Sequence, residues 1–482
     1  MYVSNKYTCR PAKWLDLTCY HLMHPFITYL SNFVSCYVRT LHEKHFDQSK
    51  LYDYLMYGPL YAALCVICAP FGLFGILLWV FLCSCFHQEK YTLVSFDDED
   101  TKLENLKTLQ IENDTIYTIG TVNLLLATEI LGRLNNIKHS DHRCQEIAKR
   151  ILNHSCELLN NVEFINHEPK INSKQDSIVT EFPNIDFLCL QEVWERSYAL
   201  GLITILKQEF KYFLYDVGEY TVKINCCMLG SGLMFASKKP ILDVDFKTFT
   251  KRIKHAKYAS QGVLCVKVAL HSDRNNCRHV GYISNLHTQA YQGEENVIAN
   301  QLSETRRFVA DFKEKTHRST DVVEFDIICG DFNADNMSIG DAPIHNHRLF
   351  YDYEDFCMAE PGQDHGWAIG TEMRQPTMYS SCLKDPFEFK KVLEDDMLRR
   401  MFILDADVTV HNTDLATKMP CLDSASRLEV LHNGGKRRVD KILTHKLHRV
   451  KVLGYAFLTT LTNLTDHLPV VMTFQVKHNR SL

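Results

Sequence analysis

Polar residues stand at the ends of several apolar segments of this sequence. An apolar run ends at Gln191-Glu192, and others end at His287 and at Asp331-Phe332-Asn333, while Asn123 lies inside a fourth. Buried polar groups need partners, and strand ends that converge at one point can supply them through a shared metal ion and water. We therefore expect these side chains to meet in one site.

The oxygen-bearing residues of this set suit a hard divalent cation. Mg²⁺ prefers one or two carboxylates, with waters and a substrate phosphate completing its shell. Glu192 and Asn123 offer oxygens of that kind, so Mg²⁺ is the expected cofactor and Mn²⁺ the alternative ion. No pair of Cys and His residues has zinc-ligand spacing of comparable quality.

A histidine near the C-terminus offers a general base. His467 lies in the segment Thr465-Asp466-His467-Leu468-Pro469, directly before the last apolar run. An imidazole with a pKa of about 6.5 suits proton abstraction at neutral pH when a carboxylate holds the ring, and Asp440 is the candidate. A lone Asp-His pair is more often a capped turn, so the prediction depends on the order of all these residues.

The segments that must position these residues alternate between strand and helix patterns. Apolar runs occur at 116–127, 185–193, 231–237, 262–270, 280–287, 325–331, 439–445 and 468–476, and helical patterns at 144–160 and 296–315. Nearly continuous apolar strands predict a sheet buried on both faces, with helices outside. The body is therefore expected to be layered α/β or α+β.

Composition excludes several classes of protein. Of 482 residues, 46% are hydrophobic and 23% charged, which excludes a disordered or fibrous chain. Lys and Arg number 53 against 58 Asp and Glu, a net charge of -5, so no nucleic-acid partner is expected. The 18 cysteines are too sparse for a disulfide scaffold, and most are expected to be reduced.

The N-terminal region predicts a membrane anchor. No charged residue occurs in the 33 residues from Tyr54 to Phe86, enough helix to cross a hydrocarbon core of about 30 Å. A weaker uncharged run covers 17–38, so a hairpin, a re-entrant pair and a single span all fit. Flanking basic residues favour two cytosolic ends with a membrane-embedded hydrophobic hairpin between them, which places the body on the cytosolic face of a Golgi, plasma, ER or mitochondrial membrane. The expected division is an anchor over 1–90, a polar tether over 91–115 and a catalytic domain over 116–482.

The ordered set of polar residues resembles the endonuclease/exonuclease/phosphatase superfamily, over about residues 116 to 476. That resemblance implies an α+β fold, the four-layer αββα sandwich also called DNase I-like. The segments LCLQEVWER, SGLMFASKKPILDVDF, GYISNLHTQA, VVEFDIICGDFNADN, GWAIGT and LTNLTDHLPVVM resemble, more narrowly, the membrane-anchored neutral sphingomyelinases, including sphingomyelin phosphodiesterases 3 and 5. The implied reaction is Mg²⁺-dependent hydrolysis of sphingomyelin to ceramide and phosphocholine.

The resemblance also implies a role for each site residue. On the metal side, Glu192 would bind Mg²⁺ with Asn123 nearby, and Asp466 would support it. The implied catalytic roles are a base, its orienting carboxylate, a donor to the developing oxyanion, and two residues that position water and phosphate; these are His467, Asp440, His287, Asp331 and Asn333.

The sequence departs from type 3 relatives at two positions. Those relatives usually carry a Lys before the glycine that is Gly262 here, and an Asp five positions before that Lys. This chain has Gln261 and Ala256 instead, which puts the rate, the mode of activation and the substrate in question.

Five basic residues lie between 247 and 257, namely Lys247, Lys251, Arg252, Lys254 and Lys257. Such a patch near a bilayer attracts anionic phospholipid, and a solvated loop is the alternative interpretation. For the whole chain, the alternatives to a sphingomyelinase are an inositol-phosphate phosphatase or nuclease with the same chemistry, and a catalytically weakened membrane scaffold.

Overall fold

The structure is a computed structural model. It describes residues 2–4, 6–46, 49–97, 115–154, 164–165, 168–169, 174–222, 227–273, 277–290, 292–293, 295–406, 432–448 and 450–476.

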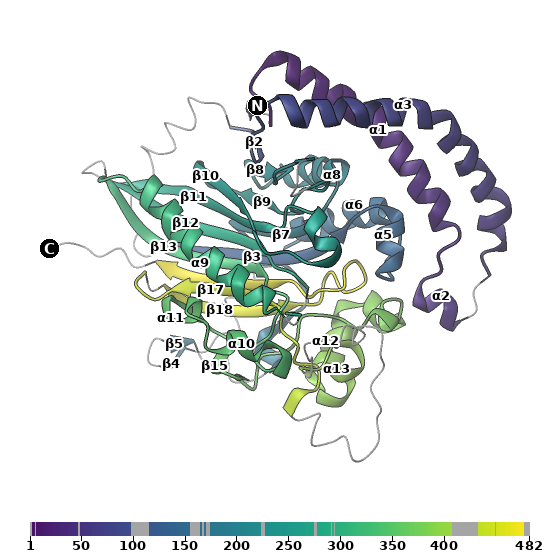
Figure 1. Cartoon of the computed structure of the whole chain (residues 1–482). Coiled ribbons are helices and arrows are strands. Elements are labelled where there is room, and N and C mark those ends of the chain that lie inside the picture. The colour runs from purple at the N-terminus through teal and green to yellow at the C-terminus, as the bar shows by residue number, and fades with distance from the viewer. Residues whose placement is uncertain are drawn as a thin grey trace.

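Two large sheets form the centre of the molecule (Figure 1). The nine-stranded sheet has the order β1 (Tyr2–Ser4), β2 (Thr92–Ser95), β8 (Tyr212–Tyr215), β9 (Met234–Ser237), β7 (Phe187–Val193), β3 (Thr115–Leu126), β19 (Val470–Val476), β18 (Lys451–Leu458) and β6 (Ile178–Val179). The six-stranded sheet has the order β10 (Ile241–Thr248), β11 (Gly262–Ser272), β12 (Arg278–His287), β13 (Asp321–Asp331), β17 (Asp440–His445) and β14 (Tyr353–Asp355).

The sheets pack face to face around an aromatic centre. The ring of Phe325 from β13 lies 5.8 Å from that of Phe187 and 5.1 Å from that of Phe474, both in the other sheet. Side chains of successive strand residues point to opposite faces, so β7 buries Phe187 between the sheets and Leu188 beneath the outer helices. This alternation explains why the strands read as continuous apolar runs.

Helices cover both outer faces. α6 (Ser140–Leu152) and α8 (Arg196–Leu206) pack on the nine-stranded sheet, and α9 (Val297–Thr316) packs on the six-stranded sheet. The layers are thus helix, sheet, sheet and helix, and the predicted αββα sandwich is confirmed. Smaller helices, among them α12 (Pro386–Glu394) and α13 (Asp396–Phe402), lie at one end of the sandwich (Figure 1).

The predicted strands and helices are present. The sequence patterns did not indicate seven further strands of the two large sheets, namely β1, β2, β6, β8, β10, β14 and β18. The helix expected over 144–160 begins earlier, at Ser140, and residues 155–160 lie outside the described ranges. Residues 91–115 were expected to be a tether, but Thr92–Ser95 form β2 and pair with β8, and residues 98–114 lie outside the described ranges.

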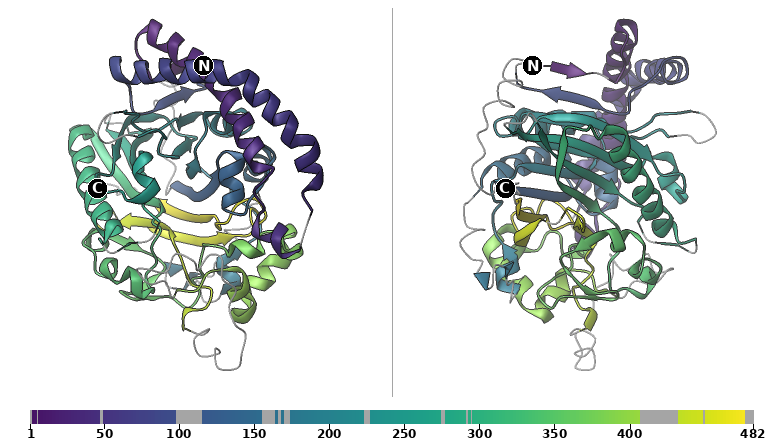
Figure 2. Two further views of the ribbon diagram at one scale, coloured as in Figure 1. Left: turned by 45° about the vertical axis from the view of Figure 1, so that its right-hand side comes forward. Right: turned by 90° about the vertical axis from the view of Figure 1, so that its left-hand side faces the viewer.

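The N-terminal helices form an arm along one side of the body (Figure 2). We define the arm as α1 (Arg10–Ser35), α2 (Leu41–His45), the π-helical turn η1 (Asp53–Tyr57) and α3 (Gly58–Cys85). α1 and α3 approach closely at Gly72, where an added Cβ would lie 2.4 Å from the Cβ of Phe26. The helix from Asp53 to Cys85 has 33 residues, and within the described ranges it alone is long and apolar enough to cross a membrane.

The arm is bound to the body at both ends. Near its start, Arg196 donates to Asp16 at 2.9 Å, and the Lys6 ammonium donates to the carbonyl of Asp216 at 2.9 Å. Further along α1, the Ser31 hydroxyl accepts from the amide of Ile130 at 3.0 Å. β1 and β2 add the arm's flanking residues to the edge of the nine-stranded sheet.

Candidate active site

Strand ends from both sheets converge on one buried site. Asn123 of β3 lies beside Gln191 of the parallel strand β7, directly before Glu192. In the other sheet, His287, Asp331 and Asp440 lie side by side in register across β12, β13 and β17. The sandwich therefore places five of the predicted residues at one edge of two facing sheets.

The Asn123 side chain joins the two sheets. Its Nδ2 donates to Glu192 Oε1 at 3.1 Å and to Asp331 Oδ2 at 3.0 Å. Its Oδ1 accepts from the amide of Leu125 at 3.1 Å. In this orientation Asn123 bridges two carboxylates as a donor, and ligation of a metal through its oxygen would require the amide to turn over.

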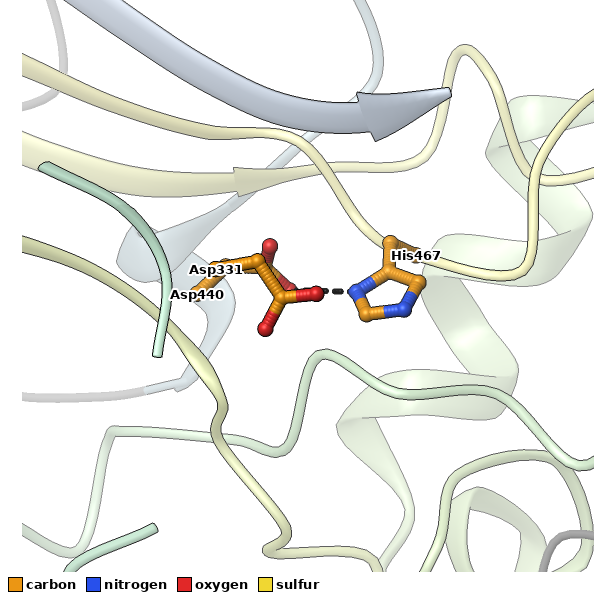
Figure 3. A group of neighbouring side chains, drawn as sticks. All are labelled: Asp331, Asp440 and His467. Atoms are coloured by element: carbon orange, nitrogen blue, oxygen red, sulfur yellow. Dashed lines mark hydrogen bonds and ion pairs between the residues drawn. The ribbon is translucent and has the colours of Figure 1, made fainter. Parts of the chain in front are cut away.

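His467 and Asp440 form a hydrogen-bonded pair (Figure 3). Nδ1 of His467 lies 2.8 Å from Oδ2 of Asp440, and both side chains are buried. With Asp331 they bring ligand atoms within 4.8 Å of one another, close enough to hold a metal ion. The bond fixes the ring so that Nε2 is the nitrogen that can exchange a proton.

His287 lies on the other side of the carboxylates. Its Nε2 is 3.8 Å from Glu192 Oε1 and 3.7 Å from Asp331 Oδ2. Its Nδ1 is buried and has no hydrogen-bond partner within the described part of the chain. Nε2 is therefore the ring nitrogen of His287 that faces the site.

Asn333 is held in a tight turn after β13. Its amide donates to Asp331 Oδ1 at 2.8 Å, and its side-chain Nδ2 donates to the carbonyl of Thr288 at 3.0 Å. Its φ of 47° is left-handed, as are the φ angles of Glu192 (56°) and Leu125 (45°). Such conformations cost about 1–3 kcal/mol each and persist where the surroundings enforce them, commonly at functional sites.

Burial and neighbouring charges shift the pKa values of His467 and Asp466. Burial alone would lower the pKa of His467, but the carboxylates of Asp440, Asp331 and Asp466 raise it well above its usual value. Burial raises the pKa of Asp466 to about 6, and the charges of Glu192 and Glu372 add to the increase although that of His467 opposes it. Asp466 is thus near Glu192, where a cation would stabilise its ionised form.

The donor set fits a divalent cation. Carboxylates outnumber cationic groups here, and one oxygen of Asp440 is buried without a partner among the described residues. Carboxylate oxygens in such excess, together with the raised pKa of Asp466, are what Mg²⁺ or Mn²⁺ would satisfy.

Three supporting residues were not predicted from the sequence. The Thr371 hydroxyl oxygen accepts from the amides of Val439 and Asp440, at 3.1 Å each. Arg437 donates to Glu372 Oε2 at 2.6 Å and to the carbonyl of Asn333 at 3.2 Å. The third is Arg143 of α6, whose guanidinium is buried and donates to the carbonyls of Leu124, Leu125 and Leu464. Only Thr371 carried a sequence signal, because it ends the GWAIGT segment.

The sequence is similar to those of known lipid hydrolases. It is 36% identical to Homo sapiens sphingomyelin phosphodiesterase 3 over 312 residues, which are 61% of this chain and 45% of the relative. It is 26% identical to Danio rerio sphingomyelin phosphodiesterase 5 over 488 residues, covering 85% of this chain and 86% of the relative. Among solved structures, a sphingomyelinase C from Streptomyces griseocarneus aligns with 74% of this chain and 99% of its own, at 14% identity and a TM-score of 0.41.

The chain spans less than half the length of the human relative. The sequence model described as "Endonuclease/Exonuclease/phosphatase family" matches residues 156–455, more than half of the chain. That match covers most of the site, from Glu192 to Asp440, and the fold is the αββα sandwich that the resemblance implies. The chain belongs to the endonuclease/exonuclease/phosphatase family.

Proposed function

We propose that the protein is a Mg²⁺-dependent sphingomyelin phosphodiesterase that releases ceramide and phosphocholine. The observation that carries the proposal is the buried His467–Asp440 pair beside Asp331 and Glu192, in a chain 36% identical to a sphingomyelin phosphodiesterase. These residues can activate a water next to a phosphate, which is what hydrolysis of a phosphodiester requires.

His467 is the general base of the proposed reaction. It takes a proton from the attacking water at Nε2, while Asp440 holds Nδ1 and stabilises the imidazolium that forms. Asp331 and Asn333, fixed by their shared turn, orient water and phosphate. His287 donates to oxygen as charge develops on it, because its Nε2 faces the carboxylates.

Glu192 and Asp466 would hold Mg²⁺, with Asn123 beside them. Bound there, the ion supplies stabilisation of negative charge on the phosphate oxygens. The 2.8 Å hydrogen bond between His467 and Asp440 favours their roles as the general base and its orienting carboxylate rather than as metal ligands.

The arm is proposed to attach the protein to a bilayer that contains the substrate. α3 presents a row of exposed apolar side chains on the face away from the body: Leu60, Val66, Ile67, Phe71, Leu73, Phe74, Leu77 and Phe81. α1 meets the body at Asp16 and again at Ser31, about 22 Å apart along a helix. Because α1 is bound to the body along its length, a perpendicular α3 would bring the charged body into the bilayer. We therefore expect α3 to lie parallel to the bilayer, in its interfacial region.

Hydrolysis assays test the proposal directly. Purified full-length protein is incubated with labelled sphingomyelin, phosphoinositide and DNA in parallel, with Mg²⁺, with Mn²⁺ and with chelator. Release of phosphocholine that needs the cation and is lost in Glu192→Ala supports the proposal. Cleavage of only phosphoinositide or DNA would contradict it.

A further inference from the structure

A cavity of about 450 Å³ lies between the arm and the body. One wall is formed by α1 and the start of α3, and the other by α5 (Glu129–Leu134), α6 and α8. None of the residues assigned above to the candidate active site lines it. Its volume falls within the range of ligand pockets, about 300–1,000 Å³.

The body side of the cavity carries two carboxylates besides the ion pair of Glu129 and Arg133. Asp141 of α6 and Glu195, which precedes α8, both line it. Neither carboxylate has a Lys or Arg partner among the residues that the structure describes. Burial, together with the charge of Asp141, raises the pKa of Glu195 to about 7, although the Ser197 hydroxyl opposes the increase. A cation bound between them would remove this repulsion.

The arm side of the cavity offers neutral donors from α1 beside one carboxylate of η1, Asp53, which lies 3.8 Å from the ammonium of Lys50. Thr28, Asn32 and Ser35 of α1 line it. The Ser35 side chain is only 4% exposed, and its hydroxyl has no hydrogen-bond partner within the described ranges. A buried hydroxyl without a partner is costly, so this wall is incomplete until an acceptor such as a phosphate oxygen occupies it.

The cation that fits is bulky and weakly hydrated. The carboxylates of this cavity do not converge as metal ligands, because in the described part of the chain only Asp331, Asp440 and His467 form such a group. The aromatic rings of Tyr57, Tyr61 and Tyr198 also line the cavity. Aromatic rings beside carboxylates are the usual surroundings of quaternary ammonium ligands.

We propose that this cavity binds the phosphocholine headgroup of a bilayer lipid, with the trimethylammonium group against Asp141 and Glu195 and the phosphate against the α1 wall. Two choline lipids carry this headgroup, phosphatidylcholine and sphingomyelin. The bound headgroup bridges the arm and the body. It also contacts the turn between β7 and α8, three residues after Glu192.

The site does not depend on hydrolysis, so it is tested by binding in an inactive background. Full-length His467→Ala protein in maltoside micelles is titrated with glycerophosphocholine, and the midpoint of thermal unfolding is followed by fluorescence. Tetramethylammonium chloride tests the cationic end alone, and glycerol phosphate and sodium chloride control for the anion and for ionic strength.

We expect glycerophosphocholine to raise the midpoint by at least about 2 °C, with a smaller rise for tetramethylammonium. The rise should be lost in Asp141→Asn/Glu195→Gln and kept in Glu146→Gln, a change on α6 outside the cavity. Ser35→Leu, which fills the cavity from the α1 wall, should also lose it and serves if the double variant does not fold. An equal rise in these variants, a rise with glycerol phosphate alone, or no rise in the parent would overturn the proposal.

Lipid nanodiscs identify the source of the headgroup. The His467→Ala protein is compared in discs of phosphatidylglycerol with and without phosphatidylcholine or sphingomyelin. Stabilisation by both lipids that the double variant lacks supports a site for choline lipids in general, and stabilisation by one of them assigns the source to it. Absence of the effect with both lipids contradicts the proposal.

Discussion

The hydroxyl oxygen of Thr371 accepts hydrogen bonds from two backbone amides at the start of β17, those of Val439 and Asp440. The carbonyl of the same residue accepts from the amide of Leu468, next to His467. One residue outside the catalytic pair thus fixes the chain positions of both partners. Its contribution should be visible when only the hydroxyl is removed.

Thr371→Val keeps the shape of this side chain but leaves the two amides without their acceptor. We expect it to lower the free energy of unfolding by about 1–3 kcal/mol and to reduce turnover more than substrate binding. Chemical denaturation and steady-state kinetics measure the two effects. Thr371→Ser retains the hydroxyl and should behave nearly as the parent; an equal loss in both variants would show that the methyl group, not the hydroxyl, matters.

Asp440→Asn removes the charge that holds His467 without changing the size of the side chain. By analogy with carboxylate-to-amide changes in other His–Asp pairs, turnover should fall by up to about 10⁴-fold. The unfolding midpoint and cation affinity, followed by Mn²⁺ paramagnetic resonance, serve as controls. A variant with parental turnover would rule out Asp440 as the orienting residue.

At the scale of elements, α2 fastens the arm to the body through one carboxylate. Glu43 accepts from the amide of Thr40 at 2.9 Å, from Arg133 of α5 at 3.0 Å and from Lys138 at 2.9 Å. Burial opposes ionisation of Glu43, but these donors outweigh it and lower its pKa to about 2. The ionised form of Glu43 is therefore the one that stabilises this contact between the arm and the body.

Because the pKa of Glu43 is depressed in the folded chain, its contribution to stability is present above the unfolded value of about 4.3 and is lost as the pH falls toward 2. At neutral pH, Glu43→Gln should cost about 3 kcal/mol, the amount that corresponds to the lowered pKa of Glu43, while Arg133 keeps its pair with Glu129. The difference in the free energy of unfolding between parent and variant, measured by denaturation, should shrink as the pH falls from about 5 to about 2. This is the pH range that the unfolded and folded pKa values of Glu43 set.

Glu146→Gln on α6 is the matched control for that experiment. Its i,i+4 pair with Arg150 is partly exposed, so the change should cost at most about 0.5 kcal/mol at any pH. If the difference in the free energy of unfolding between parent and Glu43→Gln did not depend on pH, ionised Glu43 would not be what holds α2 to the body.

Local sequence patterns predicted the elements that carry the site better than the contacts that hold it. The apolar runs before Glu192, His287 and Asp331 indicate strands because their alternate faces are both buried. β8 pairs with β2 and β18 pairs with β6, strands more than 100 residues earlier in the chain, and local patterns do not reveal such partners. Arg143 resembles a surface cation in the sequence, and only the meeting of β3 with the loop before β19 gives its guanidinium buried acceptors.

At the scale of the whole molecule, the arm decides how the body meets a bilayer. α1 contacts the body at Asp16 and at Ser31. α1 and α3 cross along one side of the body (Figure 2). The sequence is compatible with a single span as well as with a hairpin, because hydropathy predicts the length of an apolar helix but not its orientation in the bilayer. The docking contacts favour an arm parallel to the membrane surface.

Spin labels test this orientation. Nitroxides placed in turn at Leu60, Phe71 and Phe81 in full-length protein bound to vesicles should report similar shallow depths by accessibility to oxygen and to a water-soluble relaxant. An upright helix would instead place Phe71 deepest, near the bilayer centre, with the other two near opposite surfaces. A deep Phe71 with shallow Leu60 and Phe81 would contradict an α3 that lies parallel to the bilayer.

The pairing of β2 with β8 also sets an order of events during synthesis. A ribosome adds about 5–20 residues per second, so Thr92–Ser95 would wait roughly 6 to 24 seconds before Tyr212–Tyr215 emerge to pair with them. The apolar α3 has left the ribosome by then and is available for capture by lipid. If the arm attaches to a bilayer as proposed, completion of the nine-stranded sheet is expected to follow that attachment, which would keep the proposed hydrolase from maturing before it has reached its surface.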